Sequence, residues 1–162
     1  LPGVDFSTGS LGHGLSMGTG AALAARLQRS QRPGFGLLSD AECNEGATWQ
    51  AIMFAAHHRL ANLTAIVDNN RQQALGATAD VLGLEPLQTR WSAFGWTVAT
   101  VDGHDVTALA GEMRGQDPGG TPKAIIANTT FGKGVSFMEH QLKWHYWPLD
   151  ADEFAGAMQE LN

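Results

Sequence analysis

Two polar side chains follow short apolar runs and could together hold a metal ion. Asp40 comes directly after the apolar run at residues 35–39, and Asn70 follows the run at residues 63–68. One helical segment separates the two runs, so they are expected to be neighbouring parallel strands that finish at the same sheet edge. A carboxylate and an amide oxygen suit Mg²⁺ or Ca²⁺, and a bound diphosphate would complete the shell of such an ion. The spacing therefore predicts a site for a metal ion and a diphosphate.

The stretch around these residues resembles a known cofactor motif. Residues 39–51 read Ser-Asp-Ala-Glu-Cys-Asn-Glu-Gly-Ala-Thr-Trp-Gln-Ala, and residues 62–70 read Asn-Leu-Thr-Ala-Ile-Val-Asp-Asn-Asn. Together they resemble the thiamine-diphosphate motif of transketolases, which begins Gly-Asp-Gly and ends in an asparagine. Asp40 and Asn70 occupy the matching positions, whereas a serine and Ala41 replace the two glycines. Ala41 keeps the backbone N–H that would meet a phosphate, but its methyl group restricts φ.

The resemblance implies a set of site residues. The side chains of Asp40 and Asn70 and the carbonyl of Gln72 would bind Mg²⁺ (or Ca²⁺). Glu45 resembles a glutamate of a carboxylate network near the subunit interface, and His145 resembles a histidine near the reacting carbons; both are assigned catalytic roles. From the residues alone, Glu45 is almost equally well explained as an ordinary carboxylate in the first turn of a helix. The residues expected to contact thiamine diphosphate are Gly9, Leu11, Asp40, Ala41, Glu42 and Asn70.

Composition and charge limit the possible classes of protein. The chain has 162 residues, enough for one domain with a proper core. Hydrophobic residues make up 43% and charged residues 16%, which is ordinary for a globular protein. The net charge of −6 argues against nucleic acid as the main partner, and the single cysteine excludes a disulfide framework and a cysteine-based zinc site. Without a long apolar run or a signal peptide, the expected location is cytoplasmic, with no membrane as a partner.

Alternating apolar runs and amphipathic segments predict an α/β fold with a mostly parallel sheet and helices on both of its faces. Strands are expected at residues 35–39, 63–68, 96–101 and 123–128. Helices are expected at residues 11–29, 45–58, 86–94, 106–114 and 150–161. Residues 71–84 have no clean period and are expected to form a loop over the strand ends.

Several packing details are also predicted. The strand at residues 35–39 is expected to be buried, and residues 116–122 are expected to form a turn rich in proline and glycine. Ser10 and Asp105 are expected to be helix N-caps because their side-chain oxygens can accept from free backbone N–H groups. The second helix is expected to bury a stripe formed by Trp49, Ile52, Met53, Ala56 and Leu60.

The resemblance also implies an activity and partners. A member of this family would use thiamine diphosphate to move a two-carbon ketol unit between sugar phosphates. Residues 1–162 are expected to be a single diphosphate-binding domain of the split-subunit type that lacks its N-terminal portion. In this family a glutamate that contacts the aminopyrimidine lies in a separate pyrimidine-binding domain. The chain is therefore expected to be inactive alone and to work with a pyrimidine-binding subunit or domain, in a dimer or higher oligomer.

Three other interpretations compete with this one. The chain could belong to a related synthase that makes deoxyxylulose phosphate or an acyloin, and the partner domain would distinguish the two. A degenerate cofactor domain with a structural or regulatory role is suggested by Ala41, whereas Asp40, Asn70 and Glu45 count against it. A dinucleotide-binding domain is disfavoured because no Gly-x-Gly-x-x-Gly follows a predicted strand.

Overall fold

The computed structural model describes residues 3–115 and 119–161, which form a series of alternating helices and strands. The helices are α1 (His13–Leu27), η1 (Asp40–Asn44, a 3₁₀ helix), α2 (Gly46–His57), α3 (Thr78–Val81), α4 (Leu87–Ala93), α5 (Val106–Arg114), α6 (Lys143–Tyr146) and α7 (Ala151–Glu160). The strands are β1 (Gly34–Ser39), β2 (Leu63–Asn69), β3 (Gln72–Gln73), β4 (Gly76–Ala77), β5 (Thr97–Asp102) and β6 (Lys123–Asn128). The predicted turn at residues 116–122 lies partly outside the described residues.

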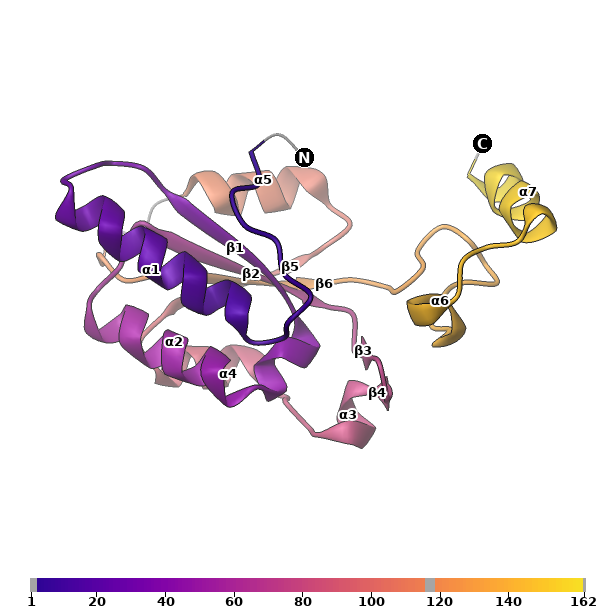
Figure 1. The fold of residues 1–162 in the computed structure, drawn as a ribbon, viewed down its shortest axis with the longest axis horizontal. Coiled ribbons are helices and arrows are strands. Elements are labelled where there is room, and N and C mark those ends of the chain that lie inside the picture. Colours follow the sequence, from indigo (N-terminus) through magenta and orange to yellow (C-terminus); the bar gives the residue numbers. More distant parts are fainter. Residues whose placement is uncertain (1–2, 116–118, 162) are drawn as a thin grey trace.

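The main sheet has four parallel strands in the order β1-β2-β6-β5. Because all four run in the same direction, their carboxyl ends meet at one edge, on the right in Figure 1. There Ser39 pairs with Asp68, and both Asn69 and Asp102 pair with Asn128. The predicted α/β fold with a mostly parallel sheet is confirmed.

One face of the sheet carries the main hydrophobic core, packed under α1, α2 and α4 (Figure 1). Leu38, Val67 and Ile126 come from three adjacent strands and pack in one cluster with Ile52 of α2 and Trp91 of α4. All five side chains are at most 1% exposed. Full burial of a side chain of this size stabilises the fold by roughly 1.5–3 kcal/mol, so this cluster holds α2 and α4 against the sheet.

Among the described helices, α5 is the one that covers the other face of the sheet, where it lies over β5 (Figure 1). Helices therefore do lie on both faces, as predicted, but the two faces are covered unequally. On β1, one of the two edge strands, Phe35 is 48% and Leu37 is 72% exposed. The prediction that residues 35–39 form a buried strand is wrong, because only Leu38 turns into the core while the neighbouring side chains alternate to the open face.

Two further predictions of packing need correction. In α2 the buried residues are Thr48, Ala51, Ile52 and Ala55, whereas Met53, expected in the core stripe, is 47% exposed. Helix α1 starts two residues later than expected, with Gly12 at the N-cap in a left-handed conformation and no side-chain cap, so Ser10 is not the cap. The prediction for Asp105 is confirmed, because its Oδ1 accepts hydrogen bonds from two backbone N–H groups of α5.

The segment at residues 71–84, expected to be a loop, contains a small hairpin and a helical turn. Strands β3 and β4 are antiparallel and pair Gln72 with Ala77 and Gln73 with Gly76. Such short strands depend on backbone hydrogen bonds and leave no apolar period in the sequence, which is why the hairpin was missed. Through this hairpin the chain turns back across the carboxyl edge of the main sheet.

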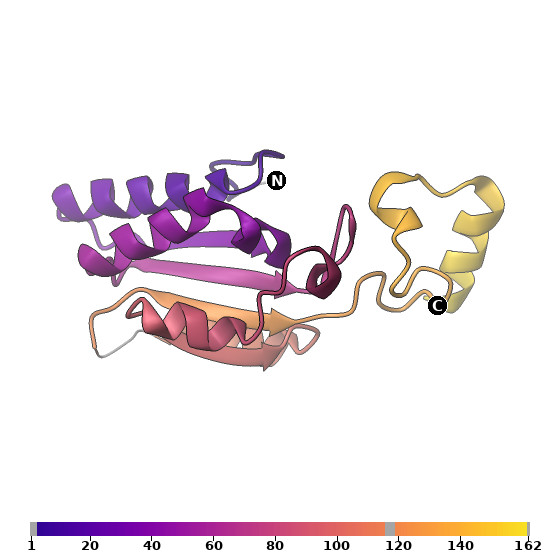
Figure 2. The ribbon, with the colours of Figure 1, turned by 90° about the horizontal axis from the view of Figure 1, so that it is seen from below.

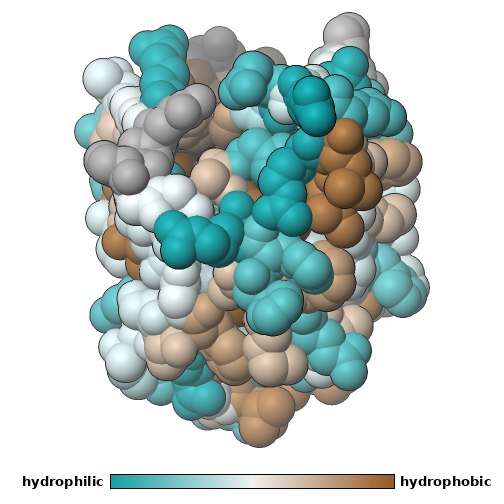
Figure 3. Space-filling view, turned by 90° about the vertical axis from the view of Figure 1, so that its left-hand side faces the viewer, coloured by the Kyte–Doolittle hydropathy of each residue, from teal (hydrophilic) through white to brown (hydrophobic). Residues whose placement is uncertain are grey.

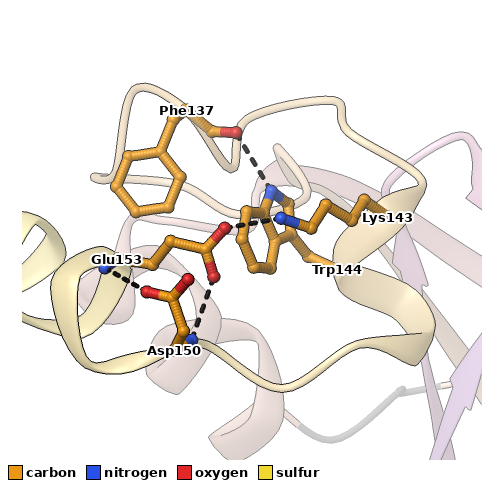
Figure 4. Close-up of polar contacts among 5 residues, drawn as sticks. All are labelled: Phe137, Lys143, Trp144, Asp150 and Glu153. Atoms are coloured by element: carbon orange, nitrogen blue, oxygen red, sulfur yellow. Dashed lines mark hydrogen bonds and ion pairs between the residues drawn. The ribbon is translucent and has the colours of Figure 1, made fainter.

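After β6 the chain leaves the sheet and forms an arm with α6 and α7, which stands beyond the carboxyl edge (Figures 1 and 2). Polar contacts within the arm include one ion pair that joins its two helices (Figure 4). Lys143 Nζ lies 2.5 Å from Glu153 Oε1, and the indole N–H of Trp144 donates to the Phe137 carbonyl at 3.0 Å. Asp150 and Glu153 form a capping box that begins α7. The opposite end of the molecule, seen in Figure 3, shows polar and apolar residues interspersed.

Candidate cofactor site

A capping box ends β1 and fixes the residue that follows it. The Ser39 hydroxyl accepts from Glu42 N at 3.3 Å, and Glu42 Oε2 accepts from Ser39 N at 3.0 Å. This reciprocal pairing satisfies two backbone N–H groups at the start of η1. The pattern Ser-x-x-Glu in the sequence thus makes the chain turn sharply at the sheet edge, with Asp40 as the first residue of the turn.

Asp40 is a buried carboxylate held by three donors. Asp40 is only 1% exposed. The Thr78 hydroxyl donates to Oδ2 at 2.8 Å, and Ala41 N donates to Oδ1 at 2.9 Å. Burial raises the pKa of the Asp40 carboxyl; Asp68 acts in the same direction, while hydrogen bonds from Thr78 and the backbone of Ala41 and Arg71 act against it. The ionised form is thus oriented by its neighbours but poorly solvated.

The residues after β2 are folded against Asp40. Asn70 Oδ1 accepts from Gln72 N at 2.9 Å, a turn in which an asparagine side chain replaces a backbone acceptor. Thr78 N donates to the Arg71 carbonyl at 3.0 Å, and the backbone N–H of Arg71 donates to Asp40. The structure therefore places Asp40 beside the segment that contains Asn70 and Gln72, as the sequence predicted for the sheet edge.

The donor atoms in this segment fit a divalent cation that also binds a diphosphate. Among residues 3–115 and 119–161 no group of three or more His, Cys, Asp or Glu side chains could hold a metal. The expected ligand set is of another kind, with one carboxylate, one amide and one backbone carbonyl. Within the described part of the chain no cationic side chain pairs with Asp40, and an uncompensated buried carboxylate favours a bound cation. With so few protein ligands, Mg²⁺ would need diphosphate and water oxygens to complete its octahedron.

Two of the residues predicted to contact the cofactor are engaged within the protein. The N–H of Ala41 donates to Asp40 Oδ1 rather than pointing away from the turn, and the residue is 7% exposed. Glu42 uses both carboxylate oxygens: one accepts from Ser39 N and the other from Gly12 N at 3.3 Å. Glu42 thus links the end of β1 to the start of α1, which is a positioning role that sequence reasoning missed.

The predicted contacts near the N-terminus lie on an exposed segment that leads into α1. Gly9 has open space around it, and Leu11 is 49% exposed. Gly12 has φ of 80°, and a Cβ built on it would lie 2.8 Å from the Cβ of Glu45. Glu45 is exposed and is the N-cap residue of α2, without a side-chain capping bond. The start of α1, the turn η1 and the start of α2 therefore meet at one corner of the sheet edge.

His145 lies on the arm rather than at this corner. It is exposed, and its ring centroid lies 6.4 Å from that of Phe131 and 5.0 Å from that of Tyr146. The Tyr146 hydroxyl donates to the Ala74 carbonyl at 2.8 Å, which ties the arm to the β3–β4 hairpin. No contact recorded in the described residues joins His145 to Asp40.

A polar network at the centre of the sheet edge was also missed. Asn69 is 5% exposed, and its Nδ2 donates to Asn128 Oδ1 at 2.9 Å and to Glu85 Oε1 at 3.3 Å. The other carboxylate oxygen of Glu85 accepts from Leu87 N at the start of α4. This network holds the ends of β2 and β6 and the start of α4 in place. The sequence does contain a sign of this network, because an asparagine ends both β2 and β6.

Comparison with known proteins identifies the family of the chain. The family model described as "Transketolase, thiamine diphosphate binding domain" matches residues 1–162. This chain belongs to the transketolase family. The resemblance drawn from the residues around Asp40 and Asn70 is confirmed, and the domain is one that binds thiamine diphosphate in this family.

Relatives of this transketolase-family chain include proteins named as separate subunits. One subunit of the apulose-4-phosphate transketolase of Actinobacillus succinogenes is 41% identical over 161 residues, which cover 99% of this chain and 58% of that protein. The 6-deoxy-6-sulfo-D-fructose transketolase subunit SqwG of a Clostridium species is 40% identical, with 99% of this chain and 58% of that protein covered. This chain thus spans about 58% of the length of these relatives.

Solved transketolase structures share the fold. Transketolase from Campylobacter jejuni superposes with a TM-score of 0.90 at 28% identity, covering 98% of this chain and 26% of that one. The Pichia stipitis enzyme in complex with sedoheptulose 7-phosphate gives a TM-score of 0.84 at 26% identity, with 99% and 25% covered. None of the helices in the described residues is long and apolar enough to cross a membrane.

Proposed function

We propose that this chain is the diphosphate-binding part of a thiamine-diphosphate-dependent transketolase that moves a two-carbon ketol unit between sugars. The observation that carries the proposal is the buried carboxylate of Asp40 at the end of β1, which pairs with no cationic side chain among the described residues. The chain also matches the family's cofactor domain over residues 1–162. The matching residues follow two neighbouring parallel strands, where open α/β sheets bind their ligands.

Each site residue has a proposed role. Asp40, the Asn70 side chain and the Gln72 carbonyl hold Mg²⁺, which in turn anchors the diphosphate. Thiamine diphosphate, when bound, supplies the nucleophilic carbon and electron sink needed to break a carbon–carbon bond next to a ketose carbonyl. Gly9, Leu11, Ala41 and Glu42 line or shape the cofactor site, Glu45 belongs to a carboxylate network, and His145 acts at the sugar. Through Gly12, Glu42 positions the segment that meets the cofactor's rings.

A partner and a substrate class belong to the same proposal. Two relatives are named as one of the subunits of an apulose-4-phosphate transketolase. These names support a second, pyrimidine-binding subunit for this chain, in an assembly that is at least dimeric. Their names and that of a third relative specify sugars that carry a phosphate or a sulfo group. We therefore propose sugars with a phosphate, or a like oxyanion, as substrates. The cytoplasmic location and the domain limits stay predictions from the sequence.

Calorimetric titration of thiamine diphosphate in the presence of Mg²⁺ tests the cofactor site in the assembly purified through a tag on this chain. Asp40→Ala is expected to abolish Mg²⁺-dependent binding, because it removes the only carboxylate of the proposed ligand set. Asp152→Ala, an exposed aspartate in the first turn of α7, is the matched control and is expected to bind normally. Unchanged affinity in Asp40→Ala would contradict the site assignment.

The reaction class is tested on the same assembly with two kinds of donor. Ketol transfer from a ketose phosphate to an aldose phosphate is the expected activity. An assembly that decarboxylates pyruvate and never uses a ketose would instead belong to the deoxyxylulose-phosphate or acyloin synthase class.

A further inference from the structure

One tyrosine hydroxyl joins the arm, residues 131–161, to the body of the protein. The Tyr146 hydroxyl donates to the Ala74 carbonyl at 2.8 Å, although the two residues are 72 positions apart. No other hydrogen bond or ion pair recorded between described residues joins residues 131–161 to residues 3–128. Tyr146 is 61% exposed, so this hydrogen bond, rather than burial, holds its ring in place.

On the body, Ala74 belongs to the segment that surrounds the proposed metal site. It lies in the turn between β3 and β4, close to Gln72, whose carbonyl is a proposed ligand. Thr78, directly after β4, donates its hydroxyl to Asp40, and the N–H of Arg71, directly before β3, donates to Asp40 as well. The β3–β4 hairpin is therefore bound to Asp40 at both of its ends. The Ala74 carbonyl thus has a fixed position relative to the metal site.

On the arm, Tyr146 follows His145, the residue proposed to act at the sugar. Their rings meet nearly edge to face, with centroids 5.0 Å apart and an interplanar angle of 74°. The ring centroid of Phe131 lies 6.4 Å from that of His145. Aromatic rings prefer this kind of tilted or edge-to-face contact to a face-to-face stack. Because His145 and Tyr146 also share the single turn of α6, the position of the imidazole depends on that of the tyrosine ring.

Contacts within the arm make its parts move together. The ion pair of Lys143 with Glu153 joins α6 to α7 (Figure 4). The Ser136 hydroxyl bonds Glu160 Oε1 at 2.9 Å near the end of α7. A neutral hydrogen bond in contact with solvent, such as that of Tyr146, favours the joined arrangement by roughly two- to twelvefold. The arm is therefore joined to the hairpin in most molecules, and loss of one hydroxyl is enough to change that.

We propose that Tyr146 is a positioning residue, whose hydrogen bond to the β3–β4 hairpin sets the place of His145 relative to the cofactor site. The inference rests on the proposed function, which assigns His145 to the sugar and Gln72 to the metal ion. The hairpin stays with the metal site, and the arm carries the imidazole. While the hydrogen bond is formed, these two parts keep one relative position. When it is broken, His145 moves with the arm.

The variant Tyr146→Phe, which removes the hydroxyl and keeps the ring, tests the proposal in the assembly purified through a tag on this chain. Ser136→Ala is the matched control, because it also removes an exposed hydroxyl hydrogen bond, but one that lies within the arm. Hydrogen–deuterium exchange at residues 72–78 and 143–147 measures the contact between arm and hairpin without turnover. Steady-state kinetics with a ketose phosphate donor measure kcat and KM, and calorimetry measures Mg²⁺-dependent binding of thiamine diphosphate.

In Tyr146→Phe, both segments are expected to exchange roughly two- to twelvefold faster, and kcat is expected to fall by a factor in the same range. The KM should stay within about twofold of wild type, because a misplaced catalytic group weakens the transition state rather than substrate binding. The Kd for thiamine diphosphate should also stay within about twofold, since the hairpin keeps its hydrogen bonds to Asp40. Ser136→Ala is expected to leave all of these values within about twofold of wild type.

A double-mutant cycle with His145→Ala separates positioning from a general loosening of the arm. If Tyr146 acts through His145, Tyr146→Phe should lower kcat by less than about twofold once the imidazole is absent. A fall as large as in the wild-type background would overturn the proposal. Unchanged exchange in Tyr146→Phe, or faster exchange with unchanged kcat, would overturn it as well. An assembly that shows faster exchange but no ketol transfer at all would contradict the proposed function and not the contact between arm and hairpin.

Discussion

Asp40 combines two properties that oppose each other. Its burial at the end of β1 destabilises the ionised carboxylate, and the same burial places that carboxylate where a cation would be strongly favoured. The Thr78 hydroxyl, 38 residues away in the sequence, holds one of its oxygens at 2.8 Å and so fixes the direction of the group. The burial of this carboxylate therefore lowers stability, a cost that is common at functional sites and agrees with the proposed metal-binding role.

We expect Asp40→Asn to be more stable than wild type at neutral pH when Mg²⁺ is removed with a chelator. The pKa of the Asp40 carboxyl is raised in the folded state, so its penalty is fully present above the folded pKa. The penalty is lost as the pH falls toward the unfolded value, because the wild-type group then becomes neutral as well. Denaturant unfolding at several pH values measures this, and the difference between the two proteins should shrink on acidification. A difference that grows toward acid pH would mean that Asp40 is stabilised as an anion by its hydrogen bonds.

At the neighbouring position we expect Ala41→Gly to lose roughly 0.4–1 kcal/mol of stability and to bind thiamine diphosphate no more weakly than wild type. Ala41 is not among the residues with positive φ and lies inside η1, so its conformation is open to alanine. Glycine would only add conformational freedom to the unfolded chain. Thermal unfolding and cofactor titration of both proteins test this. A clear loss of affinity in the glycine variant would show that the alanine methyl group makes a useful contact.

At the scale of elements, the site depends on how closely the starts of α1 and α2 approach each other. Glycine is needed at position 12 for two reasons. Its φ of 80° is unfavourable for other residues, and a Cβ there would lie only 2.8 Å from the Cβ of Glu45. The Gly12 N–H also donates to Glu42. This hydrogen bond therefore connects the start of α1 to the turn that contains Asp40.

We expect Gly12→Ala to destabilise the protein by at least about 1 kcal/mol, the cost of placing an alanine in a left-handed conformation, and to weaken cofactor binding. Gly20→Ala is the matched control in the same helix, where a Cβ meets nothing within 4 Å. Because alanine is the better helix former, this control should gain up to roughly 1 kcal/mol. Circular dichroism melts of both variants measure the effect. Equal stability of the two would show that α1 and α2 do not depend on this contact.

The whole molecule exposes apolar side chains on one face of its sheet and has an arm that extends away from the sheet. Beside α5, the second face of the sheet shows Phe35 and Leu37 to solvent, and the arm with α6 and α7 extends beyond the carboxyl edge (Figure 2). His145 is on this arm and makes no recorded contact with Asp40 in the described residues. These features support the proposal that a second subunit completes the active site.

We expect no ketol transfer by the 162-residue chain alone, even with saturating Mg²⁺ and thiamine diphosphate. The described residues do not bring His145 to the cofactor corner, and the aminopyrimidine glutamate expected for the family belongs to a separate domain. Transfer is expected only from the assembly that contains a pyrimidine-binding partner, measured in a coupled assay with a ketose phosphate donor. Turnover by the isolated chain would contradict both the split arrangement and the role given to the partner.

The sequence by itself determined the four strands of the main sheet, the longer helices between them, the metal-ligand candidates and the family. Each of these depends on local patterns: apolar runs set the strands, and the polar residues directly after them must lie at the carboxyl edge of a parallel sheet. The register of Ser39 with Asp68 then brings Asp40 and the segment of Asn70 together, as the spacing required.

Only the tertiary structure decided which strands lie at the two edges of the sheet and which residues hold Asp40. An apolar run indicates that a strand can be buried, but it does not say whether a helix covers both faces, so the exposure of Leu37 was not predictable. Thr78 reaches its position through a turn whose backbone conformation depends on packing rather than on local pattern. Contacts between residues far apart in the chain, such as Thr78 with Asp40, are products of the folded arrangement and leave no period in the sequence.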